Sequence, residues 1–84
     1  MTKIQPNRPY IHFKGNLYYV HNIVEHTETG ELLVVYQCLY PPYGMYTRSL
    51  SMFEEDVDVE REDNVTGQSK RFVLFDGKMN IKKK

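Results

Sequence analysis

The chain has 84 residues, with eleven lysines and arginines balanced against eleven aspartates and glutamates. This length allows one domain with one small core, and a formal net charge of zero argues against the basic surface that nonspecific nucleic-acid binding needs. No apolar run is long enough to span a membrane, and Cys38 is the only cysteine, so no internal disulfide can form and we expect a cytoplasmic protein.

Three regions follow one another along the chain. Residues 1–9 contain Pro6 and Pro9 and predict an extended N-terminal arm. Residues 10–76 hold all seven tyrosines and predict a single β-barrel domain. Residues 77–84 end in three lysines and predict a basic, disordered tail.

The first predicted strand runs from Tyr10 to Lys14, where apolar and polar residues alternate, and a turn at Gly15-Asn16 follows it. A long hairpin from Leu17 to Tyr40 comes next. We expect its turn to be a three-residue loop, Glu28-Thr29-Gly30, with Gly30 in the left-handed conformation.

This turn sets the register of the hairpin and places Thr27 opposite Glu31. The predicted pairs are Val24 with Val34, Asn22 with Tyr36, Val20 with Cys38 and Tyr18 with Tyr40. Even-numbered side chains of both strands then form a nearly continuous apolar face, and the other face is also half apolar. In a chain this small, two apolar faces predict long strands that bend and close into a barrel.

After the hairpin, a loop at Pro41-Pro42-Tyr43-Gly44 leads to a predicted strand from Met45 to Leu50. Ser51 and Glu54 have the spacing of a capping box, which predicts one short helical turn near residues 51–55. We expect brief pairing at Val57 to Val59 and a closing strand from Lys70 to Phe75. The predicted fold is all-β, a small SH3-like barrel of five or six short strands.

Several segments occur in a distinctive order. They are Tyr10-x-His12-Phe13-Lys14-Gly15-x-x-Tyr18-x-Val20, then His26-x-Glu28-Thr29-Gly30-Glu31, Val34-Val35-Tyr36, Leu39-Tyr40, Arg48-x-Leu50-x-Met52-Phe53, Val57 and Arg71-Phe72. In this combination, over residues 10 to 75, the chain resembles a family of small bacterial proteins catalogued as domain of unknown function 1653. The resemblance implies a compact, mostly β domain of bacteria and their phages, with no established activity.

The chain departs from this family pattern at two positions. Tyr46 stands where a tryptophan is usual, and Ser49 stands where a proline is usual. Both lie on the strand that we expect to face the ligand, so ligand preference can differ where the fold is kept.

Cationic and aromatic side chains recur within the block from Tyr10 to Phe53. An anion held by an arginine fork and a lysine, with a planar group stacked on tyrosine, is the chemistry that such a set suits. We therefore predict a noncatalytic binding module for a small anionic ligand, phosphorylated or nucleotide-like. The predicted ligand-binding residues are Lys14, Tyr18, His26, Tyr36, Tyr40 and Arg48. The competing interpretation is structural: His12 and Arg48 bond to the backbone or to Glu28 and close the barrel.

The main alternative function is a protein-interaction or self-association module, such as a homodimer, that uses the tyrosine-rich loop from Tyr40 to Tyr46. An aromatic cage formed by Tyr40, Tyr43 and Tyr46, or a groove for proline-rich peptides, also fits these rings.

Catalytic and metal chemistry have weaker support. The chain has no nucleophile in a strained glycine turn and no phosphate-cradling glycine loop, and a pair of His26 with Glu28 depends on proximity in sequence alone. His21 and His26 are five residues apart, which places them on opposite faces of a regular strand, and Cys38 pairs with neither. The acidic segment Glu54 to Asp63 lacks the spacing of a calcium loop. We expect no enzyme activity, no metal and no cofactor.

Overall fold

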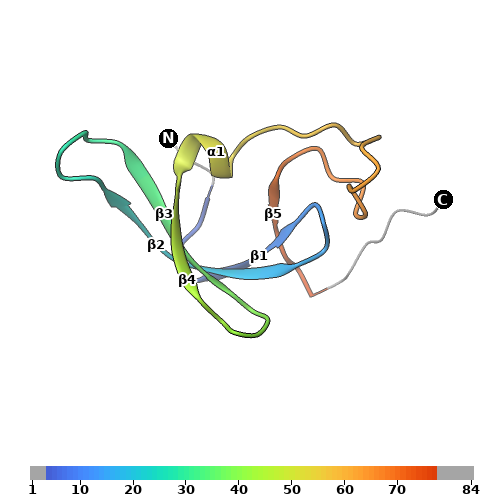
Figure 1. Ribbon diagram of the computed structural model, residues 1–84, viewed down its shortest axis with the longest axis horizontal. Coiled ribbons are helices and arrows are strands. Elements are labelled where there is room, and N and C mark those ends of the chain that lie inside the picture. The colour runs from blue at the N-terminus through green and yellow to red at the C-terminus, as the bar shows by residue number, and fades with distance from the viewer. Residues whose placement is uncertain (1–3, 78–84) are drawn as a thin grey trace.

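The computed structural model describes residues 4–77 and folds them into one antiparallel sheet with a single short helix (Figure 1). The elements are β1 (Arg8–His12), β2 (Leu17–Glu25), β3 (Leu32–Cys38), β4 (Met45–Ser49), α1 (Leu50–Phe53) and β5 (Phe72–Leu74). Their order across the sheet is β4-β3-β2-β1-β5. The mostly β prediction is confirmed. The sheet is not closed into a barrel, because β4 and β5 form its two edges and do not pair, so the SH3-like barrel is not confirmed.

The described residues include most of the predicted arm but only the first residue of the predicted tail. Ile4 is buried in the core, and β1 begins at Arg8, so part of the predicted arm belongs to the folded sheet. The predicted tail of residues 77–84 lies outside the described residues except for Gly77.

The core lies on one face of the curved sheet. It consists of Ile4, Tyr10, Val20, Val34, Tyr36, Phe53 and Phe72. After α1 the chain crosses from the β4 edge of the sheet to the β5 edge (Figure 1). Phe53 of α1 and Phe72 of β5 stack with ring centroids 3.9 Å apart. This stack joins elements from the two ends of the sheet without any β4–β5 hydrogen bonds.

The predicted register of the hairpin is wrong. The structure pairs Tyr18 with Cys38 and Val20 with Tyr36, and then pairs Asn22 with Val35, so a β-bulge separates Val20 from Asn22. A bulge adds one residue to one strand and reverses which side chains face the core. Ile23 therefore packs against the core, and Val24 is 36% exposed although an unbroken alternation would bury it.

The turn of this hairpin is one residue longer than predicted. Gly30 has the expected left-handed conformation, with φ of 75°. However, the amide of His26 donates to the carbonyl of Glu31 at 2.8 Å, which leaves a four-residue loop where three residues were expected. Relative to the prediction, the longer turn shifts the pairing register by one residue between the turn and the bulge. The bulge adds a second residue of shift in the rest of the hairpin.

The short helix forms where the sequence predicts it, but its cap differs. Ser49 is the N-cap, and its Oγ accepts a hydrogen bond from the Met52 amide at 3.3 Å. The predicted cap, Ser51, lies inside the helix. The predicted pairing near Val57 is limited to a bridge between Asp56 and Lys70. Two backbone hydrogen bonds flank it, from the Val57 amide to the Ser69 carbonyl and from the Arg71 amide to the Glu55 carbonyl.

Candidate functional site

Three of the predicted ligand-binding residues form one aromatic cluster on the core face of the sheet. Tyr18 lies between the other two, with ring centroids 5.6 Å from Tyr36 and 5.7 Å from Tyr40. The hydroxyl oxygens of Tyr18 and Tyr40 are 2.9 Å apart and share a hydrogen bond. This bond, and a further one with Cys38, raise the pKa of Tyr40 above its usual value. The hydroxyl of Tyr40 therefore stays protonated and serves as a neutral polar group.

The exposed ring of Tyr46 extends this cluster to the edge of the sheet. Tyr46 pairs with Tyr36 in the β3–β4 ladder, so the two side chains lie on the same face, with ring centroids 6.2 Å apart. The ring also lies over Gly44, because a Cβ at that position would meet the Tyr46 hydroxyl at 2.6 Å. Tyr46 was not among the six predicted ligand-binding residues. Its position at the end of the tyrosine-rich loop was the sequence feature that could have indicated it.

Arg48 lies on the same face of β4, two residues beyond Tyr46. It pairs with the fully buried Val34, so its side chain leaves β4 toward the core side of the sheet. The Nε of Arg48 is buried and has no hydrogen-bond partner within residues 4–77. A buried charged donor without a partner costs free energy. An acceptor supplied by a ligand would remove this cost.

The pKa of His12 is affected by several positive charges in the same region. The side chain is buried between the rings of Phe13, at 4.3 Å, and Phe72, at 4.9 Å. Burial and, to a smaller extent, the positive charges of Arg71, Lys14 and Arg48 together lower the pKa of His12 from 6.5 to about 4, against the opposing charge of Asp63. His12 is therefore neutral at pH 7. Its Nδ1 accepts a hydrogen bond from the Lys14 amide at 3.1 Å, which leaves the ring proton on Nε2.

Two of these three cations already have carboxylate partners. Lys14 lies 3.8 Å from Asp63, and Nη2 of Arg71 is hydrogen-bonded to Glu55. Arg48 has no such partner among the residues that the structure describes. The Nε of Arg71 is also buried without a hydrogen bond, but its guanidinium is neutralised through Nη2. Arg48 is thus the cation of this group that is left to bind an external anion.

The remaining predicted residues lie elsewhere. His26 is in the turn between β2 and β3, at the far end of that hairpin, where its Nδ1 accepts from the Glu28 amide at 3.1 Å (Figure 1). Eight residues along the chain separate it from Tyr18, which corresponds to at most about 26 Å of extended strand. Lys14 is exposed and lies against Asp63 and the Phe13 ring. The structure therefore brings together Tyr18, Tyr36, Tyr40 and Arg48 on one face, and leaves His26 and Lys14 outside this cluster.

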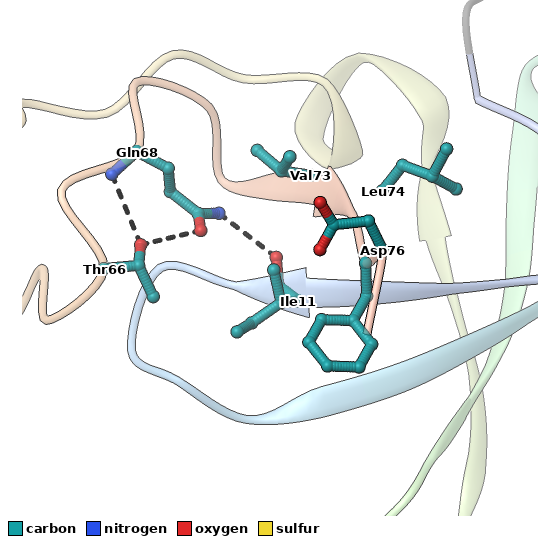
Figure 2. Close-up of a pocket in the computed structure, with 7 residues that line it drawn as sticks. Ile11, Thr66, Gln68, Val73, Leu74 and Asp76 are labelled. Carbon is teal, nitrogen blue, oxygen red and sulfur yellow. Dashed lines mark hydrogen bonds between the residues drawn. The ribbon is translucent and has the colours of Figure 1, made fainter. Parts of the chain in front are cut away.

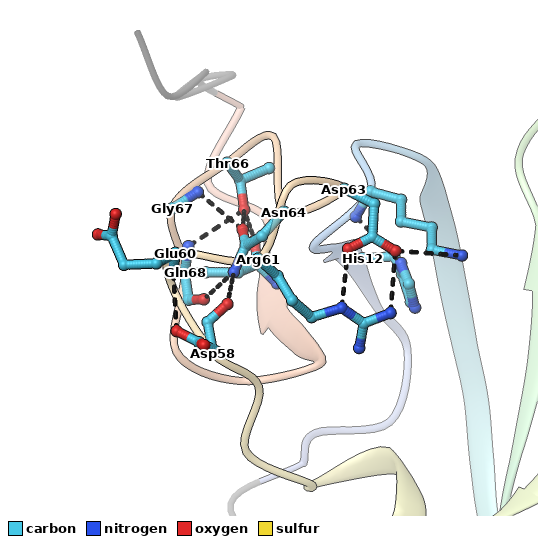
Figure 3. A network of polar contacts seen from close by, with 10 residues as sticks. His12, Asp58, Glu60, Arg61, Asp63, Asn64, Thr66, Gly67 and Gln68 are labelled. Carbon is cyan, nitrogen blue, oxygen red and sulfur yellow. Dashed lines mark hydrogen bonds and ion pairs between the residues drawn. The ribbon is translucent and has the colours of Figure 1, made fainter. Parts of the chain in front are cut away.

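The polar loop before β5 is more ordered than its composition suggests (Figure 3). Asn64 is fully buried, and its Nδ2 donates to the carbonyls of Asp58, at 3.0 Å, and Gln68, at 2.8 Å. Its Oδ1 accepts from the Gly67 amide at 2.9 Å. Gln68 then donates to the Ile11 carbonyl at 3.1 Å, which ties the loop to β1. The side-chain amide groups of Asn64 and Gln68 thus have their hydrogen-bond partners within the protein, so we assign this loop a structural role.

Two cavities lie beside β5 rather than at the tyrosine cluster. One, of about 180 Å³, is lined by Ile11, Thr66, Gln68, Val73, Leu74, Phe75 and Asp76 (Figure 2). The other, of about 480 Å³, lies between the N-terminal segment and β5 and is lined by Ile4, Gln5, Tyr10, Glu54, Lys70, Phe72, Val73 and Leu74. Neither contains any of the six predicted ligand-binding residues. Because Tyr36 is buried, a ligand at the tyrosines would bind at the exposed ring of Tyr46, on the rim of the core face.

In the described part of the chain, no group of three His, Cys, Asp or Glu side chains is placed to hold a metal ion. No helix within residues 4–77 has the length and apolar character needed to cross a membrane.

Comparison with known proteins identifies the family. The family described as "Protein of unknown function (DUF1653)" matches residues 8–74, and the chain belongs to it. A crystal structure of a protein of this family from Bordetella bronchiseptica is similar to this chain, with 35% sequence identity and a TM-score of 0.67. The similarity covers 83% of this chain and 85% of that chain. No curated protein matches. The family resemblance read from the sequence is confirmed, and it brings no activity with it.

Proposed function

We propose that this domain is a noncatalytic binding module for a small anionic ligand, phosphorylated or nucleotide-like, held on the tyrosine face beside Arg48. The observation that carries the proposal is the Nε of Arg48, which is buried on the aromatic face without a partner in residues 4–77. A guanidinium binds phosphate or carboxylate oxygens through a planar fork of N–H donors. An anion would therefore supply the acceptor that this group lacks.

The surroundings of Arg48 favour a ligand that joins an anion to a planar ring. Tyr46 is 53% exposed and lies next to Tyr36, so it offers a ring face on which a base could stack. Lys14 and Arg71 contribute to the positive potential at His12, although each also has a carboxylate partner. His12 itself, neutral at pH 7, adds a donor at Nε2.

Three further expectations, about the fold, the origin and the cellular location of the protein, accompany this proposal. The Phe53–Phe72 stack joins elements from the two ends of the sheet, which supports placing the domain among small SH3-like barrels although its edges are unpaired. The related crystal structure comes from Bordetella bronchiseptica, which supports an origin in bacteria or their phages. The free, buried Cys38 fits a reducing compartment such as the cytoplasm.

A thermal-shift panel of nucleotides and phosphorylated metabolites tests the proposal. A ligand present at about 100 times its Kd stabilises the protein by about 2.7 kcal/mol, which raises the Tm of so small a domain by about 10 °C or more. We expect Arg48→Ala to abolish the shift and Arg48→Lys to retain part of it. His26→Ala is the matched control and should keep the full shift, because His26 lies in the β2–β3 turn, at the opposite end of the hairpin from Tyr18 and Tyr40. A panel without any shift, or a full shift in Arg48→Ala, would contradict the proposal.

Self-association is the second candidate. It is favoured by the exposure of apolar side chains around the β3–β4 connection, with Tyr43, Met45 and Tyr46 between 53% and 55% exposed. Light scattering that shows a protein larger than one chain would support it.

A further inference from the structure

One edge of the sheet, β4, presents unpaired backbone groups to solvent. The Cys38 amide donates to the Gly44 carbonyl at 2.9 Å, which fixes residues 44, 46 and 48 as the ones that bond to β3. Met45, Thr47 and Ser49 therefore direct their backbone groups away from the sheet. The outward groups of Met45 and Thr47 have no partner within the described chain. Such an edge is a template for a further strand.

The side chains of β4 do little to block pairing. Met45, Tyr46 and Thr47 are exposed and uncharged, and the strand contains no proline or lysine. Protected edges usually carry one of these residues or a bulge. The single charge on β4 is Arg48, whose side chain lies on the same face as Tyr46.

The strand is complementary to itself. If two copies pair antiparallel with Thr47 at the two-fold axis, Thr47 of each copy exchanges two backbone hydrogen bonds with Thr47 of the other. The Ser49 amide of each copy then donates to the Met45 carbonyl of the other. The Ser49 carbonyl turns into α1, because Ser49 is the N-cap. The pairing thus makes four hydrogen bonds, in the region where the single chain makes none.

The same register places unlike side chains against each other. Tyr46 of one copy lies opposite Arg48 of the second copy, at a non-hydrogen-bonded position where Cα atoms are only about 4.5 Å apart. Arginine over an aromatic ring is attractive. The arrangement is isologous, so each copy gives one ring and receives one.

We propose that β4 pairs with β4 of a second copy of this chain, antiparallel and centred on Thr47, and that Tyr46 of each copy covers Arg48 of the other. The other free edge fits less well, because β5 has only three residues, Phe72–Leu74. The pairing also bears on the ligand site, and this consequence rests on the proposed function. A ring stacked on one face of the Arg48 guanidinium leaves the N–H donors in its plane open to an anion. The ligand site would then contain residues of both copies.

Sedimentation equilibrium of the full chain, without ligand, from micromolar to millimolar concentration, tests the pairing. We expect a reversible dimer. Thr47→Lys places a charge on the edge and should raise the dimer Kd at least tenfold. Thr47→Pro should do the same, because it removes the outward amide and no hydrogen bond to β3. Val73→Lys is the matched control, since it places the same charge on the exposed part of β5 and should leave the dimer unchanged.

Three results would overturn the inference: a monomer at every concentration, a dimer unaffected by both Thr47 substitutions, or a dimer lost in Val73→Lys. Circular dichroism of each variant separates lost pairing from lost folding. The two proposals fail separately. A monomer whose thermal shift still depends on Arg48 would remove the dimer and keep the ligand site, and a dimer without any ligand shift would do the reverse.

Discussion

At the scale of single residues, His12 shows how the sequence places a titratable group inside the core. It lies on β1 opposite Phe72, with aromatic rings around it and three cations near enough to act on its charge. Its Nδ1 is occupied by the Lys14 amide, so a proton added there would lose a hydrogen bond and meet positive charge. These causes act in the same direction and keep the imidazole neutral in the folded protein.

We expect folding to become less favourable as the pH falls from 6.5 toward 4. The folded-state pKa of His12 lies below the unfolded value of 6.5, so the unfolded chain takes up the proton first and its stability relative to the fold increases. The loss of free energy of unfolding should approach about 3 kcal/mol when the pH reaches 4. Urea denaturation at a series of pH values measures it.

Two asparagine variants provide the comparison for this pH dependence. In His12→Asn, the amide oxygen can still accept from the residue two positions on, so the turn is kept while the titration is removed. The slope between pH 6.5 and 4 should then largely disappear. His26→Asn makes the same replacement at an exposed turn and should leave the slope intact. An unchanged slope in His12→Asn would show that other groups cause it.

At the scale of elements, the bulge in β2 decides which residues of the long hairpin reach the core. Before the bulge Val20 is fully buried, and after it Ile23 takes the inward position instead of Asn22. Alternation from Leu17 to Glu25 gives no sign of this reversal, because apolar residues occupy both parities on either side of His21. The register therefore could not be predicted from the pattern.

Substitutions of two neighbouring residues test the register. Ile23→Ala should cost about 2 kcal/mol of unfolding free energy, because Ile23 packs against the core. Val24→Ala should cost about 0.5 kcal/mol, since this side chain is 36% exposed. Chemical denaturation measures both. The reverse order of costs would restore the unbroken alternation and remove the bulge.

Elements with strong local signals were predicted well, and those set by distant contacts were not. Gly30 fixes its left-handed turn, and a serine cap starts α1 within one residue of the expected place. The tyrosines converge as predicted because Tyr18, Tyr36 and Tyr40 keep the same parity through both register shifts. His26 lies beyond the bulge and at the start of the longer turn, so its predicted place on the tyrosine face depended on features that the sequence does not show.

At the scale of the whole molecule, long-range contacts rather than strand pairing hold the two ends of the sheet. The Phe53–Phe72 stack joins α1 to β5, and Gln68 anchors the preceding loop to the Ile11 carbonyl. This leaves the β4 edge unpaired and the ring of Tyr46 exposed beside the buried Tyr36. A closed barrel would cover β4, so the open sheet is what makes both proposals possible.

The Nε–H signal of Arg48 tests the central claim most directly. In a ¹H–¹⁵N spectrum of the labelled protein, assigned by its absence in Arg48→Lys, this signal should shift on titration with the nucleotide that stabilises the fold. The tyrosine ring signals should shift at the same midpoint, while the backbone amide of His26 stays still. Binding that leaves the Arg48 signal unmoved, and instead shifts residues around the β5 cavities, would contradict the account.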